Sequence, residues 1–328
     1  MTAALRPIAV LPLVALLAAC TGPQSALDPG GVEAARVATL FWVMVAGAAL
    51  IWVAVIGLAI YVTRVSPGAR REESGMRLIV WGGTVFPTLV LAALLTYGLT
   101  MLAELRAPAE GLRIAVSGER FWWRVRYGVG NEPAGAAAVE SANELRLPAG
   151  QRTELVLESP DVIHSLWIPS LAGKVDMIPG RSNRMVVEPT RPGRYRGVCA
   201  EFCGTAHGLM ALDVVVMVPE DFERWLAGQA ESVSQAGDHP GRGHFLANGC
   251  GACHQVRGTE AEGQVGPDLT HVGGRASIGA GLWPTTVGSL VRFISETDRA
   301  KPGVQMPAFG MLPEGDVRAI AEWLESLK

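Results

Sequence analysis

Apolar residues are concentrated in the first third of the chain, in three runs of different length. The first run, residues 8–19, follows a single charged residue, Arg6, and is too short to span a bilayer comfortably. The other two, residues 37–62 and 78–102, carry no charge and exceed the roughly 20 residues that a spanning helix needs. This pattern predicts a leader followed by two membrane-spanning helices.

The predicted leader, a signal peptide over residues 1–19, ends in the sequence Leu-Ala-Ala-Cys at residues 17–20. That ending resembles a bacterial lipobox, in which the cysteine becomes the lipidated first residue of the mature chain. We therefore expect lipidation of Cys20, at the start of an N-terminal tail over residues 20–36. An ordinary cleaved signal peptide and an uncleaved anchor are the alternatives.

The spanning helices are predicted at residues 37–63 and 78–103, joined by a loop over residues 64–77. The loop has an excess of arginine over acidic residues: Arg64, Arg70, Arg71 and Arg77 against Glu72 and Glu73. By the positive-inside rule this loop is cytoplasmic, so the tail and everything after about residue 104 lie on the periplasmic face of a bacterial inner membrane. Neither span contains His, Asp, Glu, Lys or Arg. The two helices therefore cannot hold a haem or relay protons by themselves, and a larger membrane partner is expected.

Beyond residue 104 the pattern changes to short alternating runs. Examples are residues 144–147, 153–157, 184–187 and 212–216, separated by proline–glycine turns. This pattern predicts an all-β sandwich or barrel. We assign residues 104–226 to this domain, with residues 131–142 as a loop and an amphipathic closing helix that begins at residue 219.

The remaining chain reads as a flexible polar linker, residues 227–240, and a small separate domain, residues 241–328. Residues 314–327, which include Trp323, are expected to form its last helix. The net charge of −3 and the pI of about 6.1 give no reason to expect a nucleic-acid partner. The five cysteines are an odd number, which argues against a simple disulfide framework.

The first chemical motif is VCAEFCGTAHGLM, residues 198–210. It brings two cysteines, a histidine and a methionine close together, and its glycines favour a loop between strands. A Cys199–Cys203 disulfide, a zinc site and a copper site are the alternatives. Thiolate, imidazole and thioether together suit copper, whereas methionine is a poor zinc ligand. His164, in DVIHSLWIP, is the only other histidine of the domain and would complete a set of two Cys, two His and one Met.

These residues, with LAGKVDMIPGR at residues 171–181, resemble subunit II of the haem–copper cytochrome c oxidases over residues 37–220. The resemblance implies a cupredoxin fold with a dinuclear copper A centre, in which both thiolates bridge two coppers. Carried over by motif, the implied ligands are His164, Cys199, Glu201 through its backbone carbonyl, Cys203, His207 and Met210. It also implies a magnesium site near Glu201 and Asp176, at the boundary with subunit I.

One departure from the family concerns an aromatic run. The family often begins this run with a tryptophan that receives the electron, but here it reads Arg120-Phe121-Trp122-Trp123. Trp122 and Trp123 are therefore the candidates for electron input, and ordinary packing is the alternative reading of both.

The second motif is CGACH, residues 250–254, the pattern of c-type haem attachment. A bare C-x-x-C also occurs in redox and zinc sites, but the adjacent histidine and the export signal favour haem. Cys250 and Cys253 would form the thioethers and His254 would bind the iron. Met306 is the expected second axial ligand, and its rival Met311 is otherwise expected in the core. Gly266-Pro267-Asp268-Leu269 resembles the proximal loop of class I cytochromes c, in which Pro267 would support His254.

Together the motifs predict a two-helix transmembrane hairpin, an all-β cupredoxin domain and an all-α class I cytochrome c domain. This combination resembles the caa-type oxidases, in which a cytochrome c is fused to subunit II. The implied route runs from an external donor, such as a cytochrome c or a bc-type complex, through haem c and copper A to the haem of subunit I, with subunit III alongside. A copper A nitric oxide reductase and a copper-binding assembly lipoprotein are the alternatives.

Overall fold

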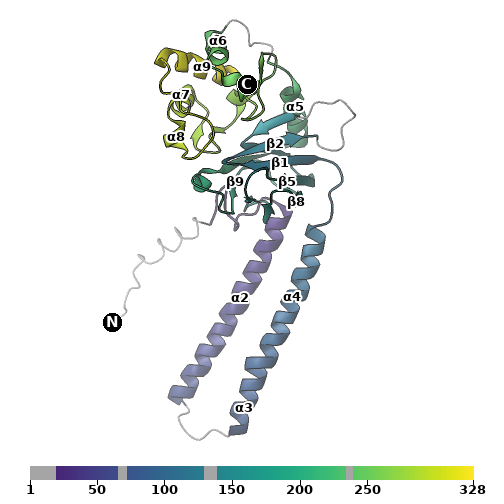
Figure 1. Cartoon of the computed structure of the whole chain (residues 1–328). Coiled ribbons are helices and arrows are strands. Elements are labelled where there is room, and N and C mark those ends of the chain that lie inside the picture. Colours follow the sequence, from purple (N-terminus) through teal and green to yellow (C-terminus); the bar gives the residue numbers. More distant parts are fainter. Residues whose placement is uncertain (1–19, 66–71, 129–138, 234–238) are drawn as a thin grey trace, which may run out of the picture. The chain divides into compact units, whose positions relative to one another are not determined.

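The computed structural model describes residues 20–65, 72–128, 139–233 and 239–328 (Figure 1). The predicted signal peptide lies outside these residues, as do parts of the predicted cytoplasmic loop and linker. The described chain forms two compact units. One is Arg36–Pro108, and the other joins the segment before Arg36 to Ala109–Lys328.

The first unit consists of two long apolar helices. The first helix is α2 (Val32–Ile60) with a π-helical end, η2 (Tyr61–Val65). The second combines α3 (Glu72–Val80), a π-helical turn η3 (Trp81–Val85) and α4 (Phe86–Leu105). Two stretches, Val32–Arg64 and Gly75–Leu105, are long and apolar enough to cross a membrane. The predicted spans are confirmed as helices, although α2 begins five residues before the apolar run and α4 ends two residues after the predicted span.

The second unit contains a β-sandwich of two five-stranded sheets within the described residues. One sheet has the order β3-β2-β1-β5-β8 and the other β4-β10-β9-β6-β7. The strands of the first are β1 (Arg113–Glu119), β2 (Trp122–Tyr127), β3 (Val139–Ala142), β5 (Thr153–Glu158) and β8 (Asn183–Val187). Those of the second are β4 (Glu144–Pro148), β6 (His164–Trp167), β7 (Lys174–Met177), β9 (Gly193–Cys199) and β10 (Ala211–Met217).

The alternating sequence pattern explains the sandwich. In β1 the apolar side chains of Ile114 and Val116 are buried, while their neighbours are only partly covered. β10 repeats the pattern with Leu212, Val214 and Val216. Because successive side chains of a strand point to opposite faces, each strand places its apolar residues in the core between the sheets. The prediction of an all-β domain is confirmed.

The prediction of a loop over residues 131–142 is wrong at its end. Residues 139–142 form β3, which pairs antiparallel with β2 from Tyr127↔Val139 to Arg124↔Ala142. The segment has a single branched apolar residue, Val139, so its alternation is too weak to read from sequence. The neighbouring strand supplies the hydrogen bonds that settle its conformation.

The segment before α2 is bound to the sandwich. The Gly30 N–H donates to the Ser170 carbonyl at 2.7 Å, and the Thr190 N–H donates to the Gly30 carbonyl at 2.8 Å. A Cβ on Gly30 would lie 2.3 Å from the Tyr195 hydroxyl, so only glycine fits this approach. The predicted N-terminal tail is therefore part of the folded unit, with Cys20 half-buried at its start.

The closing helix α5 (Pro219–Ala230) follows β10 as expected and packs Phe222 and Trp225 against Tyr127. The last domain has the helices α6 (Pro240–Ala247), α7 (Val287–Ser295), α8 (Thr297–Ala300) and α9 (Glu314–Ser326). It also has short helical turns η5 (Cys250–Ala252) and η6 (Val272–Gly274) and the two-residue strands β11 (Gln255–Val256), β12 (Ala261–Glu262), β13 (Ser277–Ile278) and β14 (Trp283–Pro284).

Helices α6 and α9 pack directly against each other. A Cβ on Gly241 would lie 2.0 Å from the Ala319 carbonyl, so glycine allows the two backbones to touch. Phe245 meets Trp323 edge to face, with ring centroids 5.2 Å apart. The terminal helix predicted at residues 314–327 is confirmed, and Trp323 is buried in its core.

Candidate redox centres

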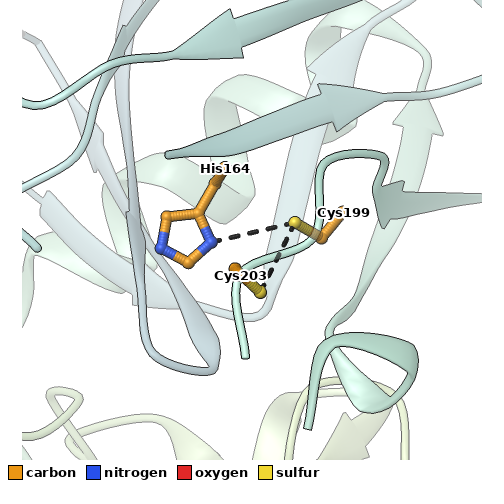
Figure 2. Close-up of side chains that lie close together, drawn as sticks. All are labelled: His164, Cys199 and Cys203. Atoms are coloured by element: carbon orange, nitrogen blue, oxygen red, sulfur yellow. Dashed lines mark hydrogen bonds between the residues drawn. The ribbon is translucent and has the colours of Figure 1, made fainter. Parts of the chain in front are cut away.

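The first candidate centre lies at one end of the second sheet. β6 begins at His164, and β9 ends at Cys199, where the loop that carries Cys203 starts. Strands β6 and β9 are neighbours, and the Ala200 N–H donates to the Ser165 carbonyl at 2.8 Å. His164 Nδ1 therefore lies 3.7 Å from Cys199 Sγ, which lies 3.8 Å from Cys203 Sγ (Figure 2).

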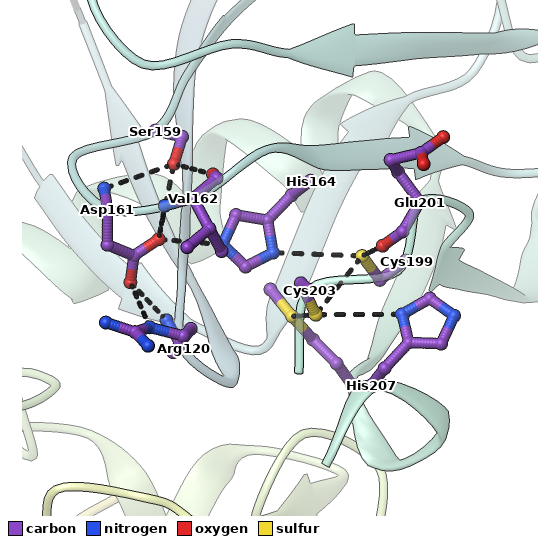
Figure 3. Close-up of polar contacts among 10 residues, drawn as sticks. Arg120, Ser159, Asp161, Val162, His164, Cys199, Glu201, Cys203 and His207 are labelled. Atoms are coloured by element: carbon purple, nitrogen blue, oxygen red, sulfur yellow. Dashed lines mark hydrogen bonds and ion pairs between the residues drawn. The ribbon is translucent and has the colours of Figure 1, made fainter. Parts of the chain in front are cut away.

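The loop between β9 and β10 brings the remaining donors to the two sulfurs. His207 Nδ1 lies 3.6 Å from Cys203 Sγ, and Met210 Sδ lies 4.0 Å from the same sulfur. The backbone carbonyl oxygen of Glu201 lies 3.2 Å from Cys199 Sγ. Figure 3 shows both cysteines, His164, His207 and the Glu201 carbonyl around one point. All six donors that the family resemblance implies are thus brought together.

This donor set fits copper. The 3.8 Å between the cysteine sulfurs is far longer than a disulfide bond of about 2.05 Å. Two thiols, two imidazoles and a thioether are the soft and borderline ligands that copper accepts, and the thioether argues against zinc. His164, Cys199, Cys203 and Met210 are buried, while His207 is partly exposed beside the largely exposed Phe202. The site is therefore enclosed on its inner side and open at His207.

Sequence reasoning missed Asp161, which orients His164. The Asp161 carboxylate lies 2.9 Å from His164 Nε2 and also accepts the backbone N–H groups of Arg120 and Val162 (Figure 3). Burial raises the pKa of this carboxyl, but these hydrogen bonds and His164 lower it by more, so the pKa is lowered overall. An ionised Asp161 holds the proton on Nε2 and leaves Nδ1 free for a metal. The Asp-x-x-His spacing was the available signal.

The two thiols differ in acidity. Burial raises the pKa of Cys199, but His164 and backbone groups outweigh it and lower the pKa overall. Burial and the neighbouring Cys199 raise the pKa of Cys203. The metal-free pair therefore favours one thiolate over two, and a bound cation is what allows both sulfurs to ionise.

The aromatic run places its members differently. Phe121 is buried. A Cβ on Gly204, in the loop between β9 and β10 that carries Cys203 (the metal loop), would lie 2.9 Å from the Phe121 ring. Trp123 is fully buried in the sandwich core, with its ring centroid 6.4 Å from that of His164. Trp122 is half-buried and lies under the Arg124 guanidinium at 4.6 Å.

The two residues of the predicted magnesium site are both exposed. Asp176 lies on β7 opposite Ser165, next to His164, and its backbone carbonyl accepts a hydrogen bond from Asn183. The Glu201 side chain points away from the sulfurs (Figure 3). The magnesium site remains a prediction.

The second candidate centre is a cavity of about 370 Å³ in the C-terminal domain. Cys250, Cys253, His254 and Met306 all line it. Most other lining residues are apolar, among them Leu269, Phe293 and Phe309, and residues 120–122 of the sandwich also line it. The four residues predicted to hold the haem, two as thioethers and two as iron ligands, therefore line one mostly apolar cavity, as a haem site requires.

His254 is fixed in an orientation that suits an iron ligand. Its Nδ1 lies 2.9 Å from the Pro267 carbonyl oxygen, which confirms that Pro267 supports it. A Cβ on Gly266 would lie 2.6 Å from His254 Cε1, so glycine lets the loop approach the ring. Burial lowers the pKa of His254, which favours the neutral imidazole that binds a metal. Nε2 is then the nitrogen available to the cavity.

The two methionines separate clearly. Met306 lines the cavity, whereas Met311 is 77% exposed. The expectation that Met311 is a core residue is wrong. Met311 lies between the Pro307–Gly310 turn and α9, and its side chain is exposed there. Met306 is left as the thioether that faces the cavity.

Comparisons with known proteins find matches for both domains that carry these sites. Residues 130–218 match the family described as "Cytochrome C oxidase subunit II, periplasmic domain", and residues 239–328 match "Cytochrome c". Cytochrome c oxidase subunit 2 of Alkalihalophilus pseudofirmus is 30% identical over 334 residues, which cover 96% of this chain and 95% of that protein. The Bacillus subtilis protein of the same name is 25% identical over 281 residues, covering 79% and 77%.

Among solved structures, the periplasmic domain of subunit II of cytochrome oxidase from Bradyrhizobium japonicum aligns with a TM-score of 0.34 at 24% identity. The alignment covers 38% of this chain and 95% of that one.

The fold and the donor sets define a membrane-anchored electron carrier with a copper-type and a haem-type centre. The chain belongs to the cytochrome c oxidase subunit 2 family. It is an electron-transfer component of an oxidoreductase complex, with a periplasmic domain, and subunit I of a haem–copper oxidase is its implied partner. The two matched domains indicate copper A and haem c binding in general.

Proposed function

We propose that this chain passes electrons from an external donor through haem c and a dinuclear copper A centre to the haem of subunit I, where oxygen is reduced to water. The observation that carries this proposal is the convergence of six donor atoms around Cys199 and Cys203, from a strand end and a separate loop. The cupredoxin domain is proposed at residues 104–226 and the cytochrome domain at residues 241–328.

Residue roles follow from the two sites. His164, Cys199, Glu201 through its carbonyl, Cys203, His207 and Met210 would hold the copper. Cys250 and Cys253 would hold haem c covalently, and His254 and Met306 would bind its iron. When bound, the two groups would supply one-electron chemistry. The protein keeps water from the buried donors and fixes the imidazoles through Asp161 and Pro267.

Phe121 and Trp122 are the proposed link between the centres. Both line the haem cavity, and the Phe121 ring packs against Gly204, the residue after Cys203. A Cβ on Gly303, three residues before Met306, would lie 3.5 Å from the same ring. Trp122 is thus supported as an electron-input residue, whereas Trp123 is better explained as core packing because it does not line the cavity.

The exposed side of the copper loop is the proposed contact with subunit I. Phe202 is 76% exposed beside the partly exposed His207, with ring centroids 5.7 Å apart. Aromatic side chains are enriched in protein interfaces, so this exposed ring fits a surface that a partner covers. A magnesium ion at Glu201 and Asp176 belongs to the same proposed boundary.

Lipidation of Cys20 in a bacterial inner membrane is also proposed. The tail that starts at Cys20 is hydrogen-bonded to the sandwich, so both are on the same face of the membrane. That face is the one on which lipidation would occur. Mass spectrometry of the mature N-terminus tests the modification, and an unmodified or uncleaved cysteine contradicts it.

The test is electron transfer within the purified full-length chain. A fast reductant should reduce the haem first. First-order reduction of the copper should then follow, with a rate constant that is independent of protein concentration. The variant C199S should keep its haem reduced and show no second phase. A second phase that scales with protein concentration contradicts transfer within the chain. Turnover of oxygen against nitric oxide in the complex with subunit I distinguishes the oxidase from a nitric oxide reductase.

A further inference from the structure

Lys301 is a buried cation in the wall of the haem cavity. It follows α8, is 2% exposed and lines the cavity together with Met306 and His254. Its Nζ donates to the Gly279 carbonyl at 2.6 Å. Burying a lysine costs free energy unless its charge is compensated, so the position calls for an explanation.

The ammonium has more hydrogen-bonding capacity than the protein uses. The ammonium carries three N–H donors. Among the described residues it makes one hydrogen bond, to Gly279, and it forms no ion pair with a carboxylate. Arg124, another buried cation, by contrast contacts both Glu119 and Glu140. Burial lowers the pKa of Lys301 to about 7, as expected for a charge without an anion.

The other cations that line the cavity have carboxylates near them. Arg120 pairs with Asp161 at 3.7 Å. Arg275 donates to the Asp268 backbone carbonyl; burial lowers its pKa, and the carboxylates of Asp268, Glu144 and Glu140 offset part of that shift. Lys301 differs from both, because no carboxylate of the described residues is near it. Its partner is therefore the occupant of the cavity or the nearby Cys203 thiol.

We propose that Lys301 binds a propionate carboxylate of the covalent haem. Haem carries two such carboxylates on an otherwise apolar ring, and an ammonium at an apolar wall is the group that would receive one. This inference rests on the proposed haem c site. By neutralising a propionate, Lys301 favours the reduced iron and raises the haem potential.

The test is potentiometric titration of the haem in the full-length chain. K301M removes the charge, K301R keeps it, and K328M is the matched control because Lys328 is an exposed lysine of the same domain. At the wild-type midpoint, the ratio of reduced to oxidised haem should fall about tenfold in K301M, since unit charges about 10 Å apart at an effective dielectric of about 20 interact on this scale. K301R and K328M should stay within about twofold of wild type.

Other results separate the possible failures. An unchanged haem potential in K301M, or a shift of the copper potential alone, overturns the role of Lys301 while leaving the haem site intact. Absence of covalent haem in the wild-type chain would instead overturn the haem site. If K301M does not accumulate, K301Q, whose amide can still donate to Gly279, replaces it. Loss of haem from both neutral variants but not from K301R supports the proposal that the charge at residue 301 binds the haem. Loss of haem from all three variants contradicts that proposal.

Discussion

The copper site and the haem cavity differ in how complete each is without its cofactor. At the copper site, neighbouring donors already lie within 3.2–4.0 Å of each other, at the end of a sheet whose core is closed. The haem site is a cavity of about 370 Å³ in a domain of fewer than 100 residues. We therefore expect the sandwich to hold the loop of Cys203 by itself, and the small domain to need haem as part of its core.

The largest expected effect comes from removing the covalent haem. In the double variant C250S/C253S, no haem should be attached, and the C-terminal domain should lose protection from hydrogen exchange because its cavity would be left empty. The sandwich should keep its protection. Hydrogen exchange read separately over residues 104–226 and 241–328 checks this, and native-like protection of the haem-free domain would break the contrast.

The matching change at the other site should remove the metal and leave the fold. C199S should abolish dinuclear copper binding, while the sandwich loses only about 1–3 kcal/mol of unfolding free energy. Copper analysis and chemical unfolding measure the two effects. Unfolding of the sandwich in C199S would mean that copper, and not the sheet, organises the loop.

The axial methionine gives a smaller effect that leaves both folds intact. M306L should lower the haem potential by about 0.2 V, part of the roughly 0.8 V range that axial ligands control. M311L is the matched control, because Met311 is exposed and its replacement should leave the potential unchanged. Equal effects of both substitutions would contradict the assignment of Met306.

The smallest of these effects concerns the support of a ligand. D161N should weaken copper binding about 10–100-fold, because the amide no longer fixes the His164 ring as a carboxylate does. D221N, an exposed position on α5, should bind copper as the wild type does. Copper competition titrations compare the two, and wild-type affinity in D161N would mean that the strand alone orients His164.

The sequence predicted what is local and what a motif encodes. The apolar runs, the alternating strands, the copper loop and CGACH are contiguous patterns, and His164 stood out as the only other histidine of its domain. Asp161 was missed because its role depends on where β6 begins. Residues 139–142 were missed because β3 owes its conformation to pairing with β2.

Burial at the two sites was also beyond the sequence. Trp122 and Trp123 are adjacent and identical in type, yet one lines the haem cavity and the other fills the sandwich core. Met311 and Lys301 both differ from what their residue types suggest: the methionine is exposed and the lysine is buried. Only the tertiary arrangement decides which face each residue meets.

The central claim is a dinuclear copper centre, and the most direct test is to count copper and spins in the same sample. The purified full-length chain, loaded with copper, should contain two coppers. In its oxidised form it should show one unpaired electron shared between the two coppers, beside the separate unpaired electron of the oxidised haem iron. One copper per chain with a full unpaired electron of its own would contradict the account.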